Sequence, residues 1–155
     1  MDEHSHLRRL DRVWRDPAIY FVTTCTSQRL KFLARPEIFD IIRDEFISAP
    51  KRHGWRVGRF VIMPDHLHFF CTEGSSEAAS LSRFVGSFKE WTAKRITKQL
   101  GLPPPVWQKQ FFDHVLRSDE SYHAKWSYAR ENPVRAGLVA KPEDWPWAGE
   151  LDILF

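Results

Sequence analysis

Apolar residues in the first third of the chain follow two different periods, which separate a strand from a helix. Residues 19–25 (IYFVTTC) are almost all β-branched or aromatic, which is typical of a strand. After Pro36, apolar residues recur at spacings of three and four, which predicts an amphipathic helix starting at this proline. We expect it to end before Pro50, with His53 and Gly54 as turn residues.

The middle of the chain predicts a pair of strands followed by a second helix. Residues 55–63 and 66–71 have strand composition, with a tight connection at Pro64 and Asp65. Helical spacing then returns, with Ser75 or Ser76 as candidate N-cap, and Gly101 and the prolines after it end the helix. Its apolar stripe is Leu81, Phe84, Val85, Phe88 and Ile96.

The last third predicts one more strand and one more helix. Residues 107–116 contain a fourth strand, and Ser118 with two acidic residues after it is a typical helix start. This helix runs towards Asn132, where Pro133 disfavours continuation. The order of elements predicts an α+β protein with the ferredoxin-like split βαβ pattern: a central antiparallel sheet, helices on one face, and a C-terminal helix that carries Tyr128.

Length and composition fit a single domain. The chain has 155 residues, of which 43% are hydrophobic, enough for one packed core. We expect residues 1–155 to form one domain with its core at about 16–140, an N-terminal arm, and a short C-terminal tail that packs back on it. Cys25 and Cys71 have no CxxC partner, which favours buried free thiols in a reducing compartment.

Nothing in the sequence indicates a membrane. No apolar run approaches the roughly 18 residues of a membrane span, and the charged N-terminus does not resemble a signal peptide. We therefore expect a cytoplasmic protein.

Positive charge is concentrated in two stretches, although the formal net charge is only +3. Such stripes suit a polyanion, but they are also typical of a solvated helix face. One stretch is N-terminal, with Arg8, Arg9, Arg12 and Arg15; the other gives the candidate DNA-binding residues Arg83, Lys89, Lys94, Arg95 and Lys98.

The segment VIMPDHLHFF places two histidines in an apolar strand. Side chains alternate along a strand, so His66 and His68 share one face while Leu67 lies on the other. Two imidazoles on one face can hold a metal ion, or they can line a polar cleft. His4 and His6 repeat the spacing, but we assign them no role in a charged terminus.

Tyr128 and Asn132 are four residues apart and therefore share one face of the last helix. An asparagine oxygen is a ligand that Mg²⁺ or Mn²⁺ accepts, and a phenol is a nucleophile if it is activated. The alternatives are a rim tyrosine and an asparagine that caps the helix before Pro133. Tyr20 lies in the first strand, and Tyr122 is about 240° from Tyr128 around the helix.

Several other residues have two open interpretations. In a polar cluster of the last strand, His114 either orients DNA, or supports the site from behind its ligands, or only pins the strand to the next helix. Phe88 and Trp91 either stack on bases or belong to the core. The members of the polar cluster are Asp113, His114 and Arg117.

Three segments together resemble a known family. VIMPDHLHFF, WQKQFFDHVLR and YARENPVRAGLV, in this order, are similar to segments of the single-tyrosine HUH transposases, and most of all to REP-associated tyrosine transposases. The resemblance covers roughly residues 16–148. It implies a ferredoxin-like fold, a divalent Mg²⁺ or Mn²⁺ held by His66, His68 and Asn132, and Tyr128 as the nucleophile.

The activity implied by this resemblance is cleavage and transfer of single-stranded or hairpin DNA through a 5′-phosphotyrosine. Relatives of this type include monomers and homodimers, so either state is compatible with the sequence. The alternatives are an inactive DNA-hairpin-binding protein, an HUH replication or conjugation initiator, and a metal hydrolase of small molecules.

Overall fold

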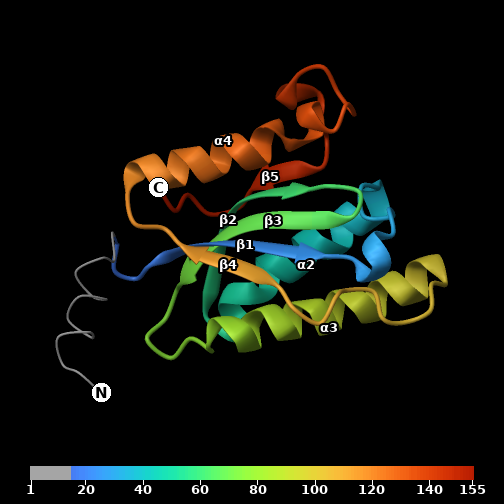
Figure 1. Ribbon diagram of the computed structural model, residues 1–155. Coiled ribbons are helices and arrows are strands. Elements are labelled where there is room, and N and C mark those ends of the chain that lie inside the picture. Colours follow the sequence, from blue (N-terminus) through green and yellow to red (C-terminus); the bar gives the residue numbers. More distant parts are fainter. Residues whose placement is uncertain (1–14) are drawn as a thin grey trace.

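The computed structural model describes residues 15–155, so the N-terminal arm with His4, His6, Arg8, Arg9 and Arg12 lies outside the described residues. The predicted order of elements is confirmed, and one short strand is added at the end (Figure 1). The strands are β1 (Ile19–Cys25), β2 (Trp55–Ile62), β3 (His66–Glu73), β4 (Phe112–Val115) and β5 (Ala148–Glu150). The helices are α2 (Pro36–His53), α3 (Leu81–Leu100) and α4 (Asp119–Arg135), with 3-10 turns η1 (Ser27–Arg29) and η2 (Pro142–Asp144).

The strands form one antiparallel sheet in the order β4-β1-β3-β2-β5, which confirms the α+β ferredoxin-like arrangement. β3, the strand with the two histidines, is the middle strand. The C-terminal tail packs back on the domain, as expected, because β5 pairs with the outer edge of β2. Trp145 reinforces this edge: its indole Nε1 donates to the carbonyl of Ile62 at 3.0 Å.

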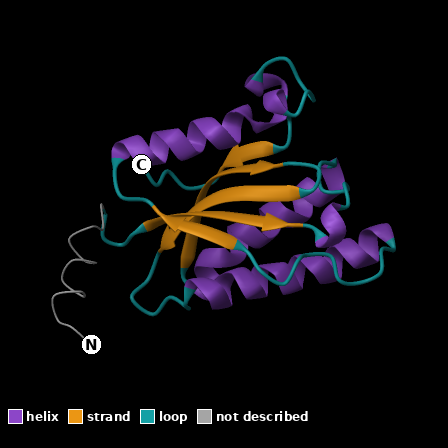
Figure 2. Ribbon diagram, in the orientation of Figure 1, coloured by secondary structure: helices purple, strands orange, loops and turns teal. Residues whose placement is uncertain are grey.

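Helices cover both faces of the sheet. α2 and α3 lie on one face and α4 lies across the other (Figures 1 and 2). Each face has its own apolar cluster, and alternate residues of β3 enter different clusters: Leu67 and Phe69 pack towards α2 and α3, whereas Phe70 packs towards α4. The predicted alternation of side chains in this strand is therefore confirmed.

Two helices continue through a proline that we expected to end them. α2 passes Pro50 and ends only at His53, where Gly54 adopts φ 74° and its N–H bonds to the Pro50 carbonyl. α4 passes Pro133 and ends at Arg135. Each proline lies in the last helical turns, where it removes one backbone hydrogen bond but leaves the remaining capping bonds intact.

The start of α3 also differs from the prediction, because Ser80, rather than Ser75 or Ser76, is the N-cap. Its hydroxyl accepts a hydrogen bond from the Arg83 N–H at 3.2 Å, whereas the Ser75 hydroxyl accepts from Glu77 within the preceding loop. Ser118 caps α4 as predicted. Cys25 and Cys71 are both buried free thiols, as expected. Among residues 15–155, no helix combines the length and apolar character that crossing a bilayer requires.

Candidate active site

The two histidines of β3 face α4 from the middle of the sheet. In the register of the sheet, His66 lies opposite Cys25 and His68 opposite Thr23 of β1. Their ring centroids are 4.8 Å apart, with the rings nearly perpendicular. His68 is only 5% exposed and stacks on Phe21 at 5.2 Å. The pair is therefore held rigidly by the central strand.

Asn132 of α4 joins the two imidazoles. Its amide Nδ2 lies 2.9 Å from Nε2 of His66 and 3.1 Å from Nε2 of His68. The helix continues past this residue to a cap at Ala136, so the alternative reading of Asn132 as the helix cap is wrong. Three nitrogen atoms from two separate elements thus meet at one point above the sheet.

The opposite nitrogens of the two rings are also fixed. Nδ1 of His66 lies 2.7 Å from Oδ1 of Asp65, and Nδ1 of His68 lies 2.8 Å from the hydroxyl of Thr23. If Nδ2 of Asn132 donates to both Nε2 atoms, each ring carries its proton on Nδ1. This tautomer leaves the Nε2 lone pairs pointing at the shared point, which is the form that binds a metal.

Burial keeps both imidazoles uncharged at neutral pH. Burial, with smaller contributions from neighbouring cationic groups, lowers the pKa of His68 to about 3. Burial also lowers the pKa of His66, although its hydrogen bond to Asp65 opposes this shift. For Asp65, burial alone would raise the pKa, but His66 and the Arg29 guanidinium at 3.1 Å lower it overall. The site therefore consists of two neutral imidazoles and a carboxylate behind one of them.

Tyr128 lies one helical turn before Asn132, beside the imidazole pair. Its ring centroid is 6.0 Å from that of His68, and its side chain is 55% exposed. Tyr122 is 1% exposed, and burial raises its pKa and that of Tyr20. Tyr128 is thus the tyrosine that is accessible at the site.

A cleft of about 490 Å³ opens between α4 and the β1–β4 edge of the sheet, in front of Tyr128. His114, from the predicted polar cluster, lines it. Alternation in β4 turns Asp113 to the opposite face, and Arg117 lies beyond the end of the strand. The cleft is lined by Phe21, Thr23, His68, Phe112, His114, Ala124, Lys125 and Tyr128.

Two cations flank Tyr128 on α4. The guanidinium of Arg135 lies over the Tyr128 ring, 4.3 Å from its centroid, and an Arg135 N–H donates to the Tyr128 carbonyl. Lys125 lines the cleft, with its ammonium 5.7 Å from the centroid of Phe21. An anionic group entering the cleft would therefore meet positive charge on both sides of the phenol.

The predicted basic residues of α3 lie elsewhere, because α3 covers the opposite face of the sheet (Figure 1). Lys89 is directed into the protein, where it donates to the carbonyls of Gln108, Lys109 and Gln110. Arg95 pairs with Asp44 at 3.1 Å and Lys94 with Glu90 at 3.3 Å. Together with Arg83 and Lys98 they are not part of the site around Tyr128. Of the two aromatic candidates of this helix, Phe88 is buried core and Trp91 is 43% exposed.

Sequence reasoning missed four residues of the site: Thr23, Asp65, Lys125 and Arg135. Asp65 directly precedes His66, and Arg135 is seven residues, or two turns, from Tyr128, so spacing alone could have identified both. Thr23 could be recognised only from the register between β1 and β3, which places it opposite His68. Lys125 could be recognised only from the position of α4 over the sheet.

The residues present fit a divalent cation. Within residues 15–155, no group of three or more His, Cys, Asp or Glu side chains is arranged to hold a metal ion. Asn132 lies at the meeting point of the two Nε2 atoms, so its side chain is the one placed to complete a site with the two histidines. The amide oxygen of Asn132 is a ligand type that suits Mg²⁺ or Mn²⁺, and imidazole is a common ligand of divalent first-row metals.

Comparison with known proteins identifies the family. The pattern of the family described as "Transposase IS200 like" matches residues 16–126, which is more than two thirds of the chain. The chain belongs to the IS200-like transposase family. The match includes His66 and His68 and ends two residues before Tyr128, so the family assignment is independent of the tyrosine and of Asn132.

Individual relatives of this IS200-like chain agree with that assignment. A REP-associated tyrosine transposase from Escherichia coli is 25% identical over 131 residues, covering 83% of this chain and 73% of the relative. A solved structure of a REP-associated tyrosine transposase bound to a REP hairpin superposes with a TM-score of 0.71 at 23% identity, covering 88% of this chain and 79% of that chain. The structural likeness confirms the fold.

Proposed function

We propose that this IS200-like transposase cleaves and rejoins single-stranded DNA next to a hairpin, through a covalent bond to Tyr128. The observation that carries the proposal is the contact of Asn132 with both Nε2 atoms of the β3 histidines, one turn from an exposed tyrosine. The REP hairpin bound by the structural neighbour supports hairpin DNA as the substrate class.

The ligands of the metal would be His66 Nε2, His68 Nε2 and the amide oxygen of Asn132, presented by rotating the amide about its side-chain bond. A bound divalent cation would supply Lewis-acid polarisation of a phosphoryl oxygen. Asp65 and Thr23 hold the imidazoles in the ligating tautomer through their Nδ1 atoms. Burial keeps both rings neutral, so protons do not compete for the Nε2 atoms near pH 7.

The protein's own groups position the reaction. The phenol oxygen of Tyr128 attacks phosphorus and loses its proton, the bond from phosphorus to the 3′ oxygen breaks, and that oxygen leaves as a hydroxyl after gaining a proton. The product is a 5′-phosphotyrosine and a free 3′-OH, so the reverse reaction rejoins DNA without another energy source. Lys125 and Arg135 place positive charge beside the anionic phosphodiester.

The arrangement supports catalysis within one chain. Tyr128 lies beside the histidines of its own chain, and the helix that carries it, α4, also carries Asn132. Nucleophile and metal ligands therefore need no second copy to meet, and a monomer is sufficient for the chemistry.

A covalent-trapping experiment tests this function. Labelled DNA with a stable hairpin and random-sequence single-stranded flanks is incubated with protein and Mn²⁺, then denatured and separated by size. We expect a covalent protein–DNA band with wild type, none after chelation, and none with Tyr128→Phe. If wild type gives no band while both proteins bind the hairpin equally, the protein is a non-catalytic hairpin binder instead.

A further inference from the structure

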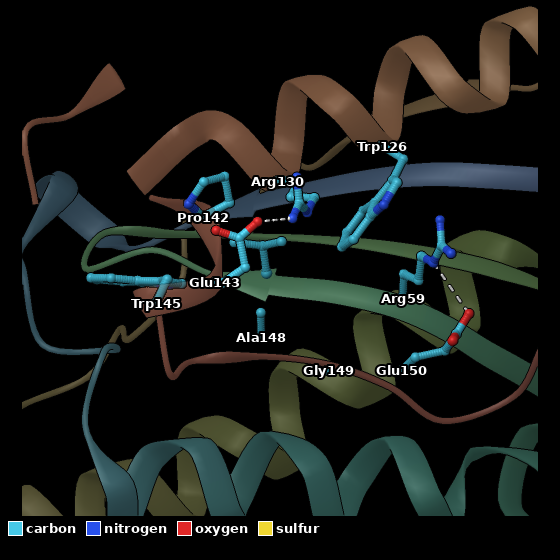
Figure 3. Close-up of a pocket in the computed structure, with 10 residues that line it drawn as sticks. Arg59, Trp126, Arg130, Pro142, Glu143, Trp145, Ala148, Gly149 and Glu150 are labelled. Carbon is cyan, nitrogen blue, oxygen red and sulfur yellow. Dashed lines mark hydrogen bonds and ion pairs between the residues drawn. The ribbon is translucent and has the colours of Figure 1, made fainter. Parts of the chain in front are cut away.

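A second cavity, of about 300 Å³, lies between α4 and the β2–β5 edge of the sheet (Figure 3). It shares no lining residue with the cleft in front of the tyrosine. Trp126 of α4 lines this cavity, and it is two residues, about 200° around the helix, from Tyr128. We call it the β5 pocket; its main side chains are Arg59, Trp126, Arg130, Glu143, Trp145 and Ala148.

The β5 pocket is close to the histidines across the sheet. His68 of β3 lies opposite Val61 of β2, and Val61 lies opposite Ala148 of β5. Both Val61 and Ala148 line the pocket. Neighbouring strands are about 4.8 Å apart, so the floor of the pocket is roughly 5–10 Å from His68. A nucleotide that flanks a scissile phosphate at Tyr128 would therefore be near enough to place its base in the pocket.

Two indole rings form opposite ends of the pocket (Figure 3). Trp126 packs on Phe70 at 6.3 Å and has the Arg59 guanidinium 4.8 Å from its ring centroid. Trp145 is anchored because its Nε1 donates to the Ile62 carbonyl. Ala148, a small residue, leaves room on the floor between them. Aromatic side chains at the rim of a cleft are the usual partners of unstacked bases in single-strand binding proteins.

The charges of the β5 pocket are balanced, which disfavours a phosphate. Arg59 pairs with Glu150 at 3.2 Å and Arg130 with Glu143 at 2.5 Å (Figure 3). A hydrogen bond to its own backbone N–H, and then Arg130, lowers the pKa of Glu143, so this carboxylate is ionised and only accepts. A phosphodiester would gain little net attraction here, because each guanidinium already has a carboxylate partner. A planar neutral group with donors and acceptors on one edge is complementary to adjacent guanidinium and carboxylate groups.

We propose that the β5 pocket binds one unstacked base of the substrate strand. The base lies against the indoles, and the Arg130–Glu143 pair contacts its hydrogen-bonding edge. This proposal rests on the proposed function, in that the substrate is single-stranded or hairpin DNA. It adds a base-reading site, separated by α4 from the cleft where the phosphate reacts.

Binding measurements in the Tyr128→Phe background test the pocket without cleavage. Two probes are compared: a random-sequence 12-nucleotide single strand and a 12-residue abasic strand with the same phosphate backbone. We expect Trp126→Leu to weaken binding of the base-bearing probe by about 5- to 150-fold, the range for loss of one stacked base. Binding of the abasic probe should not change. Ala148→Leu, which fills the pocket while keeping both indoles, should have the same effect.

Trp91→Leu is the matched control, because Trp91 is an exposed indole on α3, on the opposite face of the sheet. It should leave the preference for the base-bearing probe unchanged. Equal binding by wild-type and pocket variants would overturn the proposal, and so would a loss that is equal for the two probes. The proposed function is tested separately by the covalent band that the Tyr128-containing protein forms. If this band appears while the pocket variants bind the base-bearing probe as well as wild type does, the base-binding role of the pocket is rejected and the proposed function is not.

Discussion

The two faces of the sheet carry different kinds of side chains, although the same strands form both faces. Towards α2 and α3, β1 and β3 contribute a dry interior in which Phe69 packs on Phe46 at 4.9 Å and on Phe88 at 5.9 Å. Towards α4, the alternate residues of the same strands include Thr23, His66 and His68 among fewer apolar neighbours.

This difference shows how the fold supports a polar site. The apolar face fixes the register of β3, because a slip by one residue would turn both histidines into the aromatic core. The α4 face, which has the smaller apolar cluster, can then hold neutral imidazoles at fixed positions. Changes on the first face should therefore act on stability, and changes on the second face on chemistry.

The largest effect on stability is expected on the apolar face. Phe69→Ala should lower the free energy of unfolding by about 3–5 kcal/mol, because Phe69 is fully buried and leaves a cavity among aromatic rings. Denaturant unfolding measures this. Phe112→Ala is the control on the α4 face: Phe112 is 61% exposed, and its removal should change the free energy of unfolding by less than about 0.5 kcal/mol. Similar losses for the two variants would contradict the division between the faces.

A smaller effect is expected from the hydroxyl behind His68. Thr23→Val keeps the side-chain shape but removes the oxygen that lies 2.8 Å from Nδ1 of His68. Loss of such a supporting hydrogen bond should weaken Mn²⁺ binding, measured by calorimetric titration, by about 10- to 100-fold.

The neighbouring threonine provides a matched control for this change. Thr24 is fully buried and points to the opposite face, and its hydroxyl has no hydrogen-bond partner. Thr24→Val should leave Mn²⁺ affinity unchanged and should raise the free energy of unfolding by about 1 kcal/mol or more, since an unsatisfied buried hydroxyl is removed. Equal effects of the two substitutions on Mn²⁺ affinity would show that Thr23 does not act through His68.

The pH dependence of the free energy of unfolding tests whether His68, on the α4 face, is buried as a neutral imidazole. The folded pKa of His68 is about 3 and its ordinary value is 6.5, so between these values the unfolded chain binds more protons. His68 therefore contributes full stability above pH 6.5, and this contribution is lost as the pH falls, by about 1.4 kcal/mol per pH unit. Unfolding of the chelator-treated protein should show this slope, and His68→Phe should show a shallower one. Parallel curves from pH 7 to pH 4 would exclude the buried neutral imidazole.

Most of the fold could be predicted from the sequence because its elements carry strong local signals. The strand composition of β1, the apolar stripe after Pro36 and the cap at Ser118 each determine local structure. The helix ends were less predictable, since Pro50 and Pro133 are tolerated when a cap or buried packing follows. β5 has only three residues and forms because the edge of β2 is available, a tertiary effect that no local pattern indicates.

The site was predictable only in part, because local spacing assigns a residue to a face of its element but does not place one element against another. The HxH spacing and the spacing of Tyr128 and Asn132 are local, so each pair could be assigned to one face of its element. Whether α4 would lie over β3 depended on the topology. Thr23, Lys125 and the whole β5 pocket are brought to the site by strand register and helix placement.

Mapping the covalent product shows which tyrosine of this chain attacks the DNA. The chain contains three tyrosines, so nuclease digestion of the trapped adduct, followed by peptide mass spectrometry, identifies the one that carries a nucleotide. We expect a nucleotide phosphate on Tyr128, formed with Mn²⁺ and absent both after chelation and in His68→Phe. A nucleotide on Tyr20 or Tyr122, or an equal yield on Tyr128 without metal, would contradict this expectation.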